Sequence, residues 1–237
     1  MPIRLVDISE YKAITKFYPQ GDDDCQLYLP LYDHALRGSE AIVSKDQNLH
    51  VCTVTGAVWR VIGRDFDGLD DKIDVSDESS FDFETTSPFS IVIWSKRDAT
   101  GDKGLWHKMN WTSNKGYFLG DYTNKIYFQL QSDVTYKFKK STSTIANGVW
   151  FHAGGTYDGS ATLAGIKVYL NGIDDSDAGA EVGTLGSLLN DVTPAIGWRG
   201  DAETYFNGLI GEVFIYSRAL TALEIRDNYL ATKWRYS

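Results

Sequence analysis

The amino-acid sequence predicts an all-β protein in which two antiparallel sheets face each other as a β-sandwich. Short β-like runs separated by turn residues recur along most of the 237 residues, a rhythm typical of sandwiches and barrels. Several runs alternate apolar and polar residues, as antiparallel strands do when one face is buried and the other meets water. Hydrophobic residues make up 43% of the chain and aromatic residues 14%, which is enough to build a core.

Residues 1–25 are expected to form an arm that precedes the sandwich. Asp7 is followed three residues later by Glu10, which is the spacing of residues that cap the start of a helix. Apolar side chains then recur roughly on one helical face until Pro19, where a helix must stop. The pattern favours a helix within the arm.

Residues 26–237 are expected to form one sandwich domain. Strands are predicted at residues 26–29, 90–94, 125–131, 135–139, 166–170 and 212–216. Five pairs whose glycine can adopt a positive φ indicate turns: Asp67-Gly68, Asn147-Gly148, Asp158-Gly159, Asn171-Gly172 and Asn207-Gly208. Thr221 and Glu224 have the spacing of a capping box, which predicts a short C-terminal helix that ends near Thr232.

The charge balance excludes two classes of partner. The formal net charge is −9 and the isoelectric point is near 4.9. Nucleic-acid binders need a basic surface to displace counterions, and anionic membranes attract basic segments. No run approaches about 18 consecutive apolar residues, and the N-terminus has no charged-then-apolar leader. We therefore expect no nucleic acid, no membrane insertion and no export by a signal peptide.

The two cysteines leave two alternatives open. Cys25 and Cys52 are too few for a disulfide framework or a four-cysteine zinc site. They can pair if the fold brings them together, or they can remain as two reduced, buried thiols.

Five motifs, in order along the chain, resemble those of laminin-G-like, concanavalin A-like jelly-roll domains, a group with pentraxin-like members. The matches are the FDG-x-DD-x-x-x-V opening at 66–75, an aromatic-Ser-apolar-x-x-Trp strand at 89–94, W-x-H-x-x-x-T-x-D-G at 150–159, the following strand and turn at 167–172, and the closing strand and helix at 206–225. The resemblance covers about residues 26–232. It implies a concanavalin A-like jelly roll for the predicted sandwich.

Large aromatic residues at strand positions are expected to fill the space between the two sheets. Trp94, Trp150, Phe206 and Phe214 occupy such positions. Two facing sheets lie about 10 Å apart, and side chains of this size fill that layer. We expect all four to belong to the core rather than to a binding site.

The resemblance also makes catalysis a possibility to weigh, because enzymes on this fold include glycan hydrolases and polysaccharide lyases. A retaining glycosidase needs two carboxylates about 5 Å apart, for example as Glu-x-Asp-x-Glu on one strand face, and the chain has no such triplet. The local motifs that carry the lyases' Arg, His and Tyr are not recognisable, and the four histidines lack zinc-ligand spacing. The sequence predicts a protein that is not an enzyme.

Calcium is the cofactor that the resemblance suggests, because several relatives hold Ca²⁺ at the sandwich rim. Ca²⁺ takes oxygen ligands, and Asp67, Asp70, Asp71 and Asp158 are the candidate carboxylates in predicted loops. The closing strand of the family usually reads G-x-I-D-E-V, whereas this chain has Gly211 at the Asp position. That departure removes one carboxylate beside Glu212.

Glycan binding would require aromatic side chains with amides and charged groups near them. Three loop groups meet this description: Trp111 with Asn110 and Asn114, Tyr122 with Asp121, and Trp198 with Arg199, Asp201 and Tyr205. For each tryptophan, packing against the sandwich is the competing interpretation.

Three functions remain open at this stage. The favoured hypothesis is a structural or adhesion protein on a virion surface, such as a phage decoration or tail-associated protein, because lysis releases such proteins without an export signal. In that case the arm, with Ile3, Leu5, Ile8, Tyr11 and Phe17, docks on other subunits or on a second copy of the chain. Folding of the arm back onto its own sandwich is an equally favourable alternative. The alternative is a calcium-assisted glycan-binding lectin, which would be extracellular. A polysaccharide-active enzyme is the third.

Overall fold

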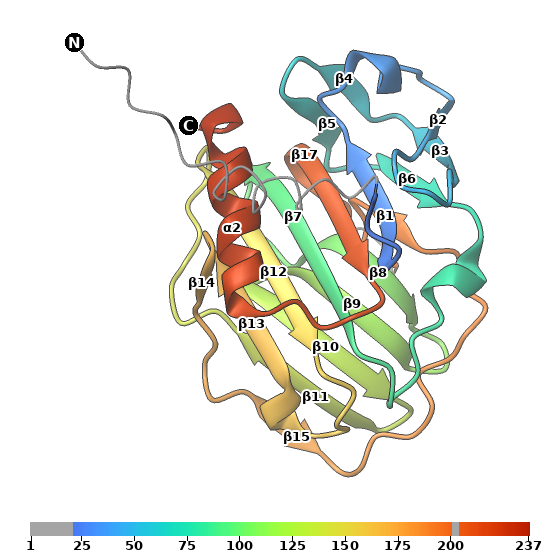
Figure 1. Cartoon of the computed structure of the whole chain (residues 1–237), viewed down its shortest axis with the longest axis vertical. Helices are drawn as coiled ribbons and strands as arrows, with labels where there is room; N and C mark the ends of the chain where they lie inside the picture. Colours follow the sequence, from blue (N-terminus) through green and yellow to red (C-terminus); the bar gives the residue numbers. More distant parts are fainter. Residues whose placement is uncertain (1–20, 201–203) are drawn as a thin grey trace, which may run out of the picture.

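The computed structural model describes residues 21–200 and 204–237 and shows two antiparallel sheets packed face to face (Figure 1). Within these residues one sheet, called sheet A here, has eight strands, and the other, sheet B, has nine. The predicted two-sheet antiparallel sandwich is confirmed. The predicted arm helix, and Ile3, Leu5, Ile8, Tyr11 and Phe17 with it, lie outside the described residues.

Sheet A has the order β14-β13-β12-β7-β17-β5-β4, with β1 also paired to β17. Its strands are β1 (Cys25–Pro30), β4 (Val58–Arg60), β5 (Gly63–Asp67), β7 (Phe89–Arg97), β12 (Trp150–Tyr157), β13 (Ile166–Leu170), β14 (Ile173–Asp174) and β17 (Asn207–Tyr216). Sheet B has the order β15-β11-β10-β9-β8-β16-β6-β3-β2. Its strands are β2 (Ala41–Val43), β3 (Val51–Thr55), β6 (Lys72–Val75), β8 (Lys103–Asn110), β9 (Lys115–Tyr122), β10 (Lys125–Ser132), β11 (Thr135–Lys140), β15 (Ala180–Val182) and β16 (Ala195–Ile196).

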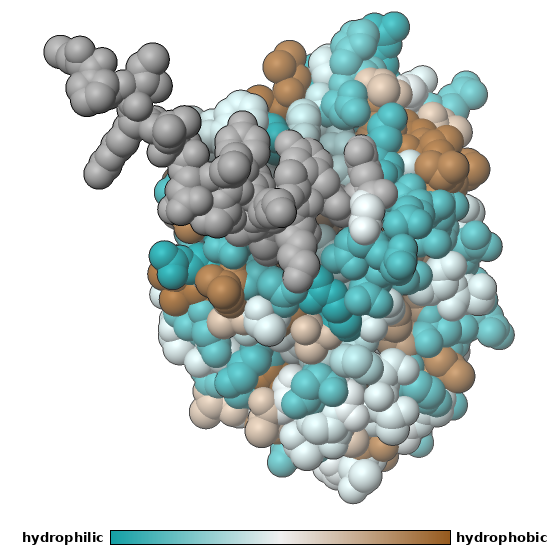
Figure 2. All heavy atoms as spheres, viewed as in Figure 1, coloured by the Kyte–Doolittle hydropathy of each residue, from teal (hydrophilic) through white to brown (hydrophobic). Residues whose placement is uncertain are grey.

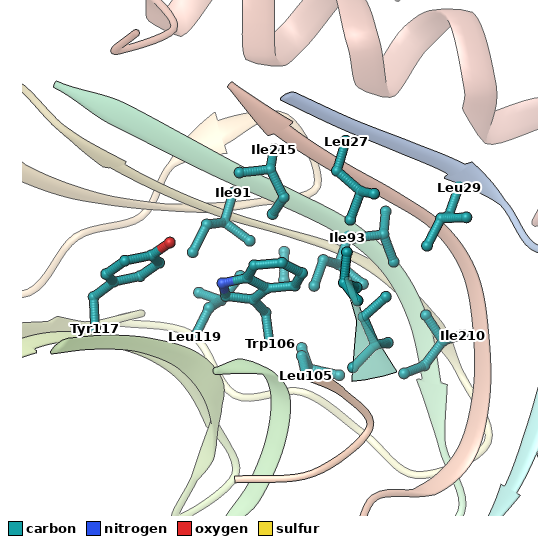
Figure 3. Close-up of a cluster of buried hydrophobic side chains, with 14 of the residues drawn as sticks. Leu27, Leu29, Ile91, Ile93, Leu105, Trp106, Tyr117, Leu119, Ile210 and Ile215 are labelled. Atoms are coloured by element: carbon teal, nitrogen blue, oxygen red, sulfur yellow. The ribbon is translucent and has the colours of Figure 1, made fainter. Parts of the chain in front are cut away.

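The main core lies between the two sheets, as Figure 3 shows. Leu27, Ile91 and Ile215 approach from sheet A, and Trp106 and Leu119 approach from sheet B. All five are fully buried. Because successive side chains of a strand point to opposite faces, each strand that supplies this core also presents every second side chain to an outer face.

The outer face of sheet A is covered by the C-terminal helix α2 (Ala222–Thr232), which lies in front of β7, β12 and β13 in Figure 1. Val92, Phe214 and Ile225 belong to a second buried cluster under this helix. The helix begins at Thr221, whose side chain and that of Glu224 form the predicted capping box. The predicted C-terminal helix is therefore confirmed.

This second cluster corrects one expectation about the core. Phe206 does lie between the sheets, but Trp94, Trp150 and Phe214 do not. Trp94 stacks on Tyr229 and Tyr236 at ring-centroid distances of 5.5 and 4.5 Å, and Trp150 lies 4.6 Å from Tyr236. The sequence pattern identified buried aromatic residues without showing which side of the sheet buries them.

Within residues 21–200 and 204–237, four shorter helices of the 3-10 type occur: η3 (His34–Leu36), η4 (Glu78–Phe81), η5 (Leu163–Gly165) and η6 (Lys233–Arg235), the last of which directly follows α2. The six predicted strand segments fall within β1, β7, β10, β11, β13 and β17. Asn207-Gly208, in contrast, forms no turn and lies inside β17. There Gly208 adopts φ 138°, and a Cβ at this position would lie 2.8 Å from the Cα atom of Arg97.

Both cysteines are free and buried, so the disulfide alternative is not what the structure shows. Cys25 belongs to the cluster under α2, whereas Cys52 belongs to the core between the sheets. Burial raises the pKa of the Cys52 thiol to about 12. Both thiols are therefore protonated near neutral pH.

No helix among residues 21–200 and 204–237 combines the length and the apolar character that crossing a membrane requires. On the α2 side of the molecule, hydrophobic residues form separate patches among hydrophilic and neutral ones (Figure 2).

Candidate functional site

The outer face of sheet B is lined by aromatic and amide side chains. On β10, Ile126, Phe128 and Leu130 point into the core, so Tyr127 and Gln129, which alternate with them, point outward. The ladder aligns Tyr127 with Lys140 and Gln129 with Phe138 of β11. Outward residues of neighbouring strands therefore form rows across the face.

Aromatic rings follow one another along these rows. The ring of Tyr127 lies 5.8 Å from Phe118, 5.3 Å from Tyr122 and 4.9 Å from Phe138, and Phe138 lies 5.9 Å from Tyr136. Phe118 is buried beneath its neighbours, and Tyr122 is 36% exposed. We call this surface the aromatic face, and its members are Phe118, Tyr122, Tyr127, Gln129, Gln131, Tyr136, Phe138 and Lys140.

A chain of hydrogen bonds orients the polar groups of the aromatic face. The Tyr127 hydroxyl donates to Gln129 Oε1 at 2.5 Å, and Gln129 Nε2 donates to Gln131 Oε1 at 2.5 Å. Gln131 Nε2 in turn donates to the carbonyl oxygen of Asp133 at 3.1 Å. Burial raises the pKa of the Tyr127 hydroxyl, and the charge of Arg199 opposes this shift. Tyr127 therefore remains a neutral hydrogen-bonding group.

A second group of side chains, which we call the Trp198 corner, borders the same face of sheet B. Its members are Trp111, Trp198, Arg199 and Tyr205. Trp198 stacks on Tyr205 at 5.6 Å between ring centroids, and Trp111 Nε1 donates to the carbonyl oxygen of Arg199 at 2.5 Å. The Arg199 guanidinium lies 5.1 Å from the Trp111 ring. The 6.3 Å contact between Trp111 and Phe118 joins the corner to the aromatic face.

The glycan-site residues chosen from the sequence are thus partly brought together. Trp111, Tyr122, Trp198, Arg199 and Tyr205 share one side of the molecule. Asn114 instead forms part of the turn between β8 and β9 with φ 51°, a conformation that asparagine tolerates well. Asp201 lies outside the described residues, and Asp121 points inward to an ion pair with Arg97.

Of the aromatic face, only Tyr122 is among the site residues that the sequence predicts. The members without such a prediction are Phe118, Tyr127, Gln129, Gln131, Tyr136, Phe138 and Lys140. The available signal was the period of two along β10 and β11, where each outward position carries a tyrosine, phenylalanine, glutamine or lysine. On an ordinary solvent-facing strand these positions carry mostly charged and small polar residues.

The acidic loop between β5 and β6 brings three predicted calcium ligands together. Carboxylate oxygens of Asp67, Asp70 and Asp71 lie within 4.8 Å of one another. Ca²⁺ binds oxygen at about 2.3–2.6 Å, so one ion fits among them. Asp71 is buried and accepts a 2.8 Å hydrogen bond from the backbone N–H of Asp67. Burial, together with the charges of Asp67, Asp70 and Asp65, raises the pKa of Asp71.

Asp158 does not join this group, which corrects the predicted ligand set. Asp158 and Asp67 lie near opposite ends of β7. Asp158 follows Tyr157, which pairs with Phe89, the first residue of β7. Asp67 pairs with Asn207, and the next residue, Gly208, pairs with Arg97, the last residue of β7. Nine residues of β7 separate these two ends, or about 26 Å at about 3.3 Å per residue. Asp158 Oδ1 instead accepts a hydrogen bond from the backbone N–H of Ser160.

The outer face of sheet A contains a different charged group, buried under the C-terminal segment. Glu212 is fully buried and pairs with Arg235, whose guanidinium lies 4.1 Å from the Tyr32 ring. Burial raises the pKa of Glu212 to about 7, against the attraction of Arg235.

At neighbouring Gly211, a Cβ would lie 2.6 Å from the hydroxyl oxygen of Tyr236. Tyr236 occupies the space that the side chain of the family's aspartate would need.

The two antiparallel sheets and the C-terminal helix define a jelly-roll domain of the concanavalin A-like type. The chain belongs to the concanavalin A-like lectin/glucanases superfamily, whose family model matches residues 66–226. The resemblance inferred from the motifs is confirmed. No curated protein sequence matches the chain significantly.

Several solved structures share the fold. The binding domain of Paraclostridial Mosquitocidal Protein 1 has a TM-score of 0.67 at 18% identity, over 90% of this chain and 52% of that one. Domain 4 of an extracellular arabinanase from Geobacillus stearothermophilus, in complex with arabinotriose, has a TM-score of 0.61 at 18% identity, over 87% and 98%. A Trypanosoma rangeli sialidase mutant with trans-sialidase activity has a TM-score of 0.65 at 16% identity, over 90% and 34%.

The chain thus spans about half the length of the toxin binding domain, matches nearly the whole arabinanase domain, and matches one third of the sialidase. Several of the similar structures are described as binding domains, among them those of botulinum neurotoxin serotypes D and G. At these identities the likeness establishes the fold.

Proposed function

We propose that this protein is a non-catalytic glycan-binding module and that the aromatic face is its binding surface. The observation that carries the proposal is the continuous row of rings on β9, β10 and β11, in which Phe118 is buried, Tyr122 is exposed and Tyr127 and Phe138 are half-buried. Sugar rings have apolar faces that stack on aromatic side chains, while their hydroxyls need oriented polar partners. The chain of bonds through Tyr127, Gln129 and Gln131 provides such partners.

A glycan array tests this proposal with three forms of the protein. Wild type is expected to bind a defined set of glycans, and Tyr127→Ala combined with Phe138→Ala is expected to lose at least about tenfold in affinity, because stacked rings contribute about 1 kcal/mol or more each. Trp234→Ala is the matched control, since it removes a ring that is 68% exposed beside α2. Unchanged binding by the double variant would exclude the aromatic face as the site.

We propose further that Asp67, Asp70 and Asp71 hold Ca²⁺ next to the Trp198 corner. β6 follows these residues, and its first residue, Lys72, places its ammonium 5.0 Å from the Trp198 ring. An ion in the loop would fix its conformation and supply positive charge beside this corner. The expected result is glycan binding that weakens when a chelator replaces calcium.

The virion-surface role stays a prediction that is compatible with glycan binding, since one domain can attach to a particle and to a sugar through different surfaces. Asp22 and Asp24 pair with Arg218, and β1 begins at Cys25, so a deletion that tests the arm should end at residue 20. The shortened protein is expected to lose assembly with partner subunits and to keep its glycan affinity. Normal assembly without residues 1–20 would contradict the docking role.

A further inference from the structure

The aromatic face lacks acidic groups although the chain as a whole is acidic. The protein has 32 acidic and 23 basic residues, yet strands β8, β9, β10, β11 and β15 contain only Asp121 and Glu181 as carboxylates. Asp121 alternates with the outward residues of β9 and pairs with Arg97. Glu181 lies opposite Lys137 in the ladder and pairs with its ammonium. The outward positions of these five strands therefore carry no negative charge.

Lys140 places a positive charge on the aromatic face. Its ammonium lies 4.5 Å from the ring centroid of Tyr122, 5.6 Å from Phe138 and 5.9 Å from Tyr127. Rings at these distances attract an ammonium but do not neutralise it. Among residues 21–200 and 204–237, no carboxylate forms an ion pair with this ammonium. Asp177 Oδ1 accepts a hydrogen bond from the backbone N–H of Lys140 at 2.9 Å.

A second cation reinforces this end of the face. Lys125 is the first residue of β10 and lies opposite Tyr122, and its ammonium donates to the carbonyl oxygen of Thr142 at 2.9 Å. A bond to a carbonyl leaves the positive charge in place. Lys125 and Lys140 therefore place two ammonium groups at the Tyr122 end of the aromatic face, while the net charge of the protein repels anions in general. The carboxylates of Asp102 and Asp175 at this end accept from the backbone N–H groups of Thr123 and Ser143.

We propose that the aromatic face selects glycans that carry an anionic group, a carboxylate or a sulfate, and that Lys140 binds this group while a sugar ring stacks on Tyr127 or Phe138. This inference rests on the proposed glycan-binding function and adds the chemical class of the ligand. An ammonium is a compact point charge and recognises either kind of anion. The rings beside Lys140 displace water from the contact, which strengthens the attraction between opposite charges.

The test is an array of matched glycan pairs in which each acidic member has a neutral counterpart. Uronic-acid oligosaccharides are paired with their methyl esters, sialylated glycans with their desialylated cores, and sulfated glycans with desulfated ones. Wild type, Lys140→Gln, Lys140→Arg and Lys233→Gln are compared on this array. Lys233→Gln is the matched control because it also removes one ammonium beside a tyrosine ring, but away from the aromatic face. The Lys233 ammonium lies 5.6 Å from the ring of Tyr229, near the C-terminal end of α2.

We expect wild type to bind acidic members at least about tenfold more tightly than their neutral counterparts, since hydrogen bonds to charged groups contribute more than neutral ones. Lys140→Gln should remove most of this preference, while Lys140→Arg and Lys233→Gln should keep it. Raising the salt concentration from about 50 to 500 mM should weaken binding of the acidic members only. A preference for the acidic member of the uronic-acid or sialylated pairs would identify a carboxylate as the bound group, and a preference within the sulfated pairs would identify a sulfate.

Two results would overturn the inference and leave the proposed function intact. One is equal binding of acidic and neutral members, and the other is an acidic preference that Lys140→Gln does not change. Binding of no glycan at all would instead contradict the proposed function itself. Circular dichroism of each variant confirms that a lost interaction does not reflect a lost fold.

Discussion

The outer faces of the two sheets carry similar numbers of aromatic rings and use them in opposite ways. On sheet A, Trp94 and Phe214 are 3% and 2% exposed, because α2 and the C-terminal segment cover them. On sheet B, Tyr127 and Phe138 remain half-buried and form a surface. The comparison teaches that aromatic residues at strand period do not by themselves distinguish packing from binding. What covers the sheet decides between the two.

The faces also differ in how they handle charge. On sheet A the fully buried Glu212 pairs with the half-buried Arg235, which lies over the Tyr32 ring, whereas on sheet B the ammonium of the half-buried Lys140 lies among aromatic rings. A paired and covered charge is a packing element. A cation whose ring neighbours leave it unneutralised is available to a ligand.

The largest expected effect contrasts Trp94→Ala with Tyr127→Ala. Trp94→Ala should lower the free energy of unfolding by about 3–5 kcal/mol, because it empties space between Tyr229 and Tyr236. Tyr127→Ala should cost about 1–2 kcal/mol, since its ring is half-buried. Urea unfolding of the two variants measures both values. Equal losses would mean that the two faces are packed alike.

The pH dependence of stability sharpens the description of sheet A. The pKa of Glu212 is raised to about 7 in the folded protein, above the ordinary glutamate value near 4.3. The folded state therefore holds more protons than the unfolded state between these values, and stability contributed by Glu212 falls as pH rises across this window. Between about pH 4.3 and 7, the free energy of unfolding of wild type relative to Glu212→Gln should fall by at most about 1.4 kcal/mol per pH unit.

Comparison with Glu212→Gln is needed because other buried groups titrate in the same pH range. Burial raises the pKa of Asp121 to about 6, which acts in the same direction, and lowers that of His152 to about 4, which acts in the opposite one. Both contributions cancel when wild type and Glu212→Gln are unfolded in the same buffers. A pH-independent difference between the two proteins would show that Glu212 titrates normally.

Gly211→Asp tests whether Tyr236 has taken the place of the family's aspartate. The new side chain would collide with the Tyr236 ring, since its Cβ would lie 2.6 Å from Cζ. Overpacking of this kind costs about 1–3 kcal/mol. In a Tyr236→Ala background the same substitution should cost less, and a double-mutant cycle by chemical unfolding measures the difference. Equal costs in both backgrounds would show that a clash with Tyr236 does not cause the loss of stability in Gly211→Asp.

The smallest expected effect comes from calcium. At a concentration tenfold above its dissociation constant, Ca²⁺ should stabilise the protein by about 1.4 kcal/mol, seen as a higher Tm in thermal unfolding. Asp70→Asn should remove the increase. Asp158→Asn is the matched control and should keep it, because Asp158 lies at the opposite end of sheet A. No increase in Tm with wild type would contradict the calcium proposal.

The sandwich itself could be predicted because its signals are local. Thr221 and Glu224 specify the start of α2 within four residues, and the alternation along β10 specifies which side chains face the core. The side of sheet A on which Trp94 is buried could not be predicted, because it depends on where α2 returns along the sheet. That placement is a contact between distant segments.

The candidate site could be predicted only in part from the sequence, because several of its residues come together through contacts between distant segments. Asp67, Asp70 and Asp71 are neighbours in sequence, so their grouping was predictable. Trp111 and Arg199 come together only through the loop after β16, which brings distant segments side by side. Lys140 was overlooked because its significance arises from Tyr122 and Phe138, which contact it across neighbouring positions of the folded sheet.

Hydrogen exchange measured with and without the strongest glycan from the array tests the central claim most directly. Binding on the aromatic face should slow exchange in peptides from β9, β10 and β11 and leave α2 and the C-terminal segment unchanged. Protection centred on α2, or none on sheet B, would contradict the assignment of the outer face of sheet B as the glycan-binding surface.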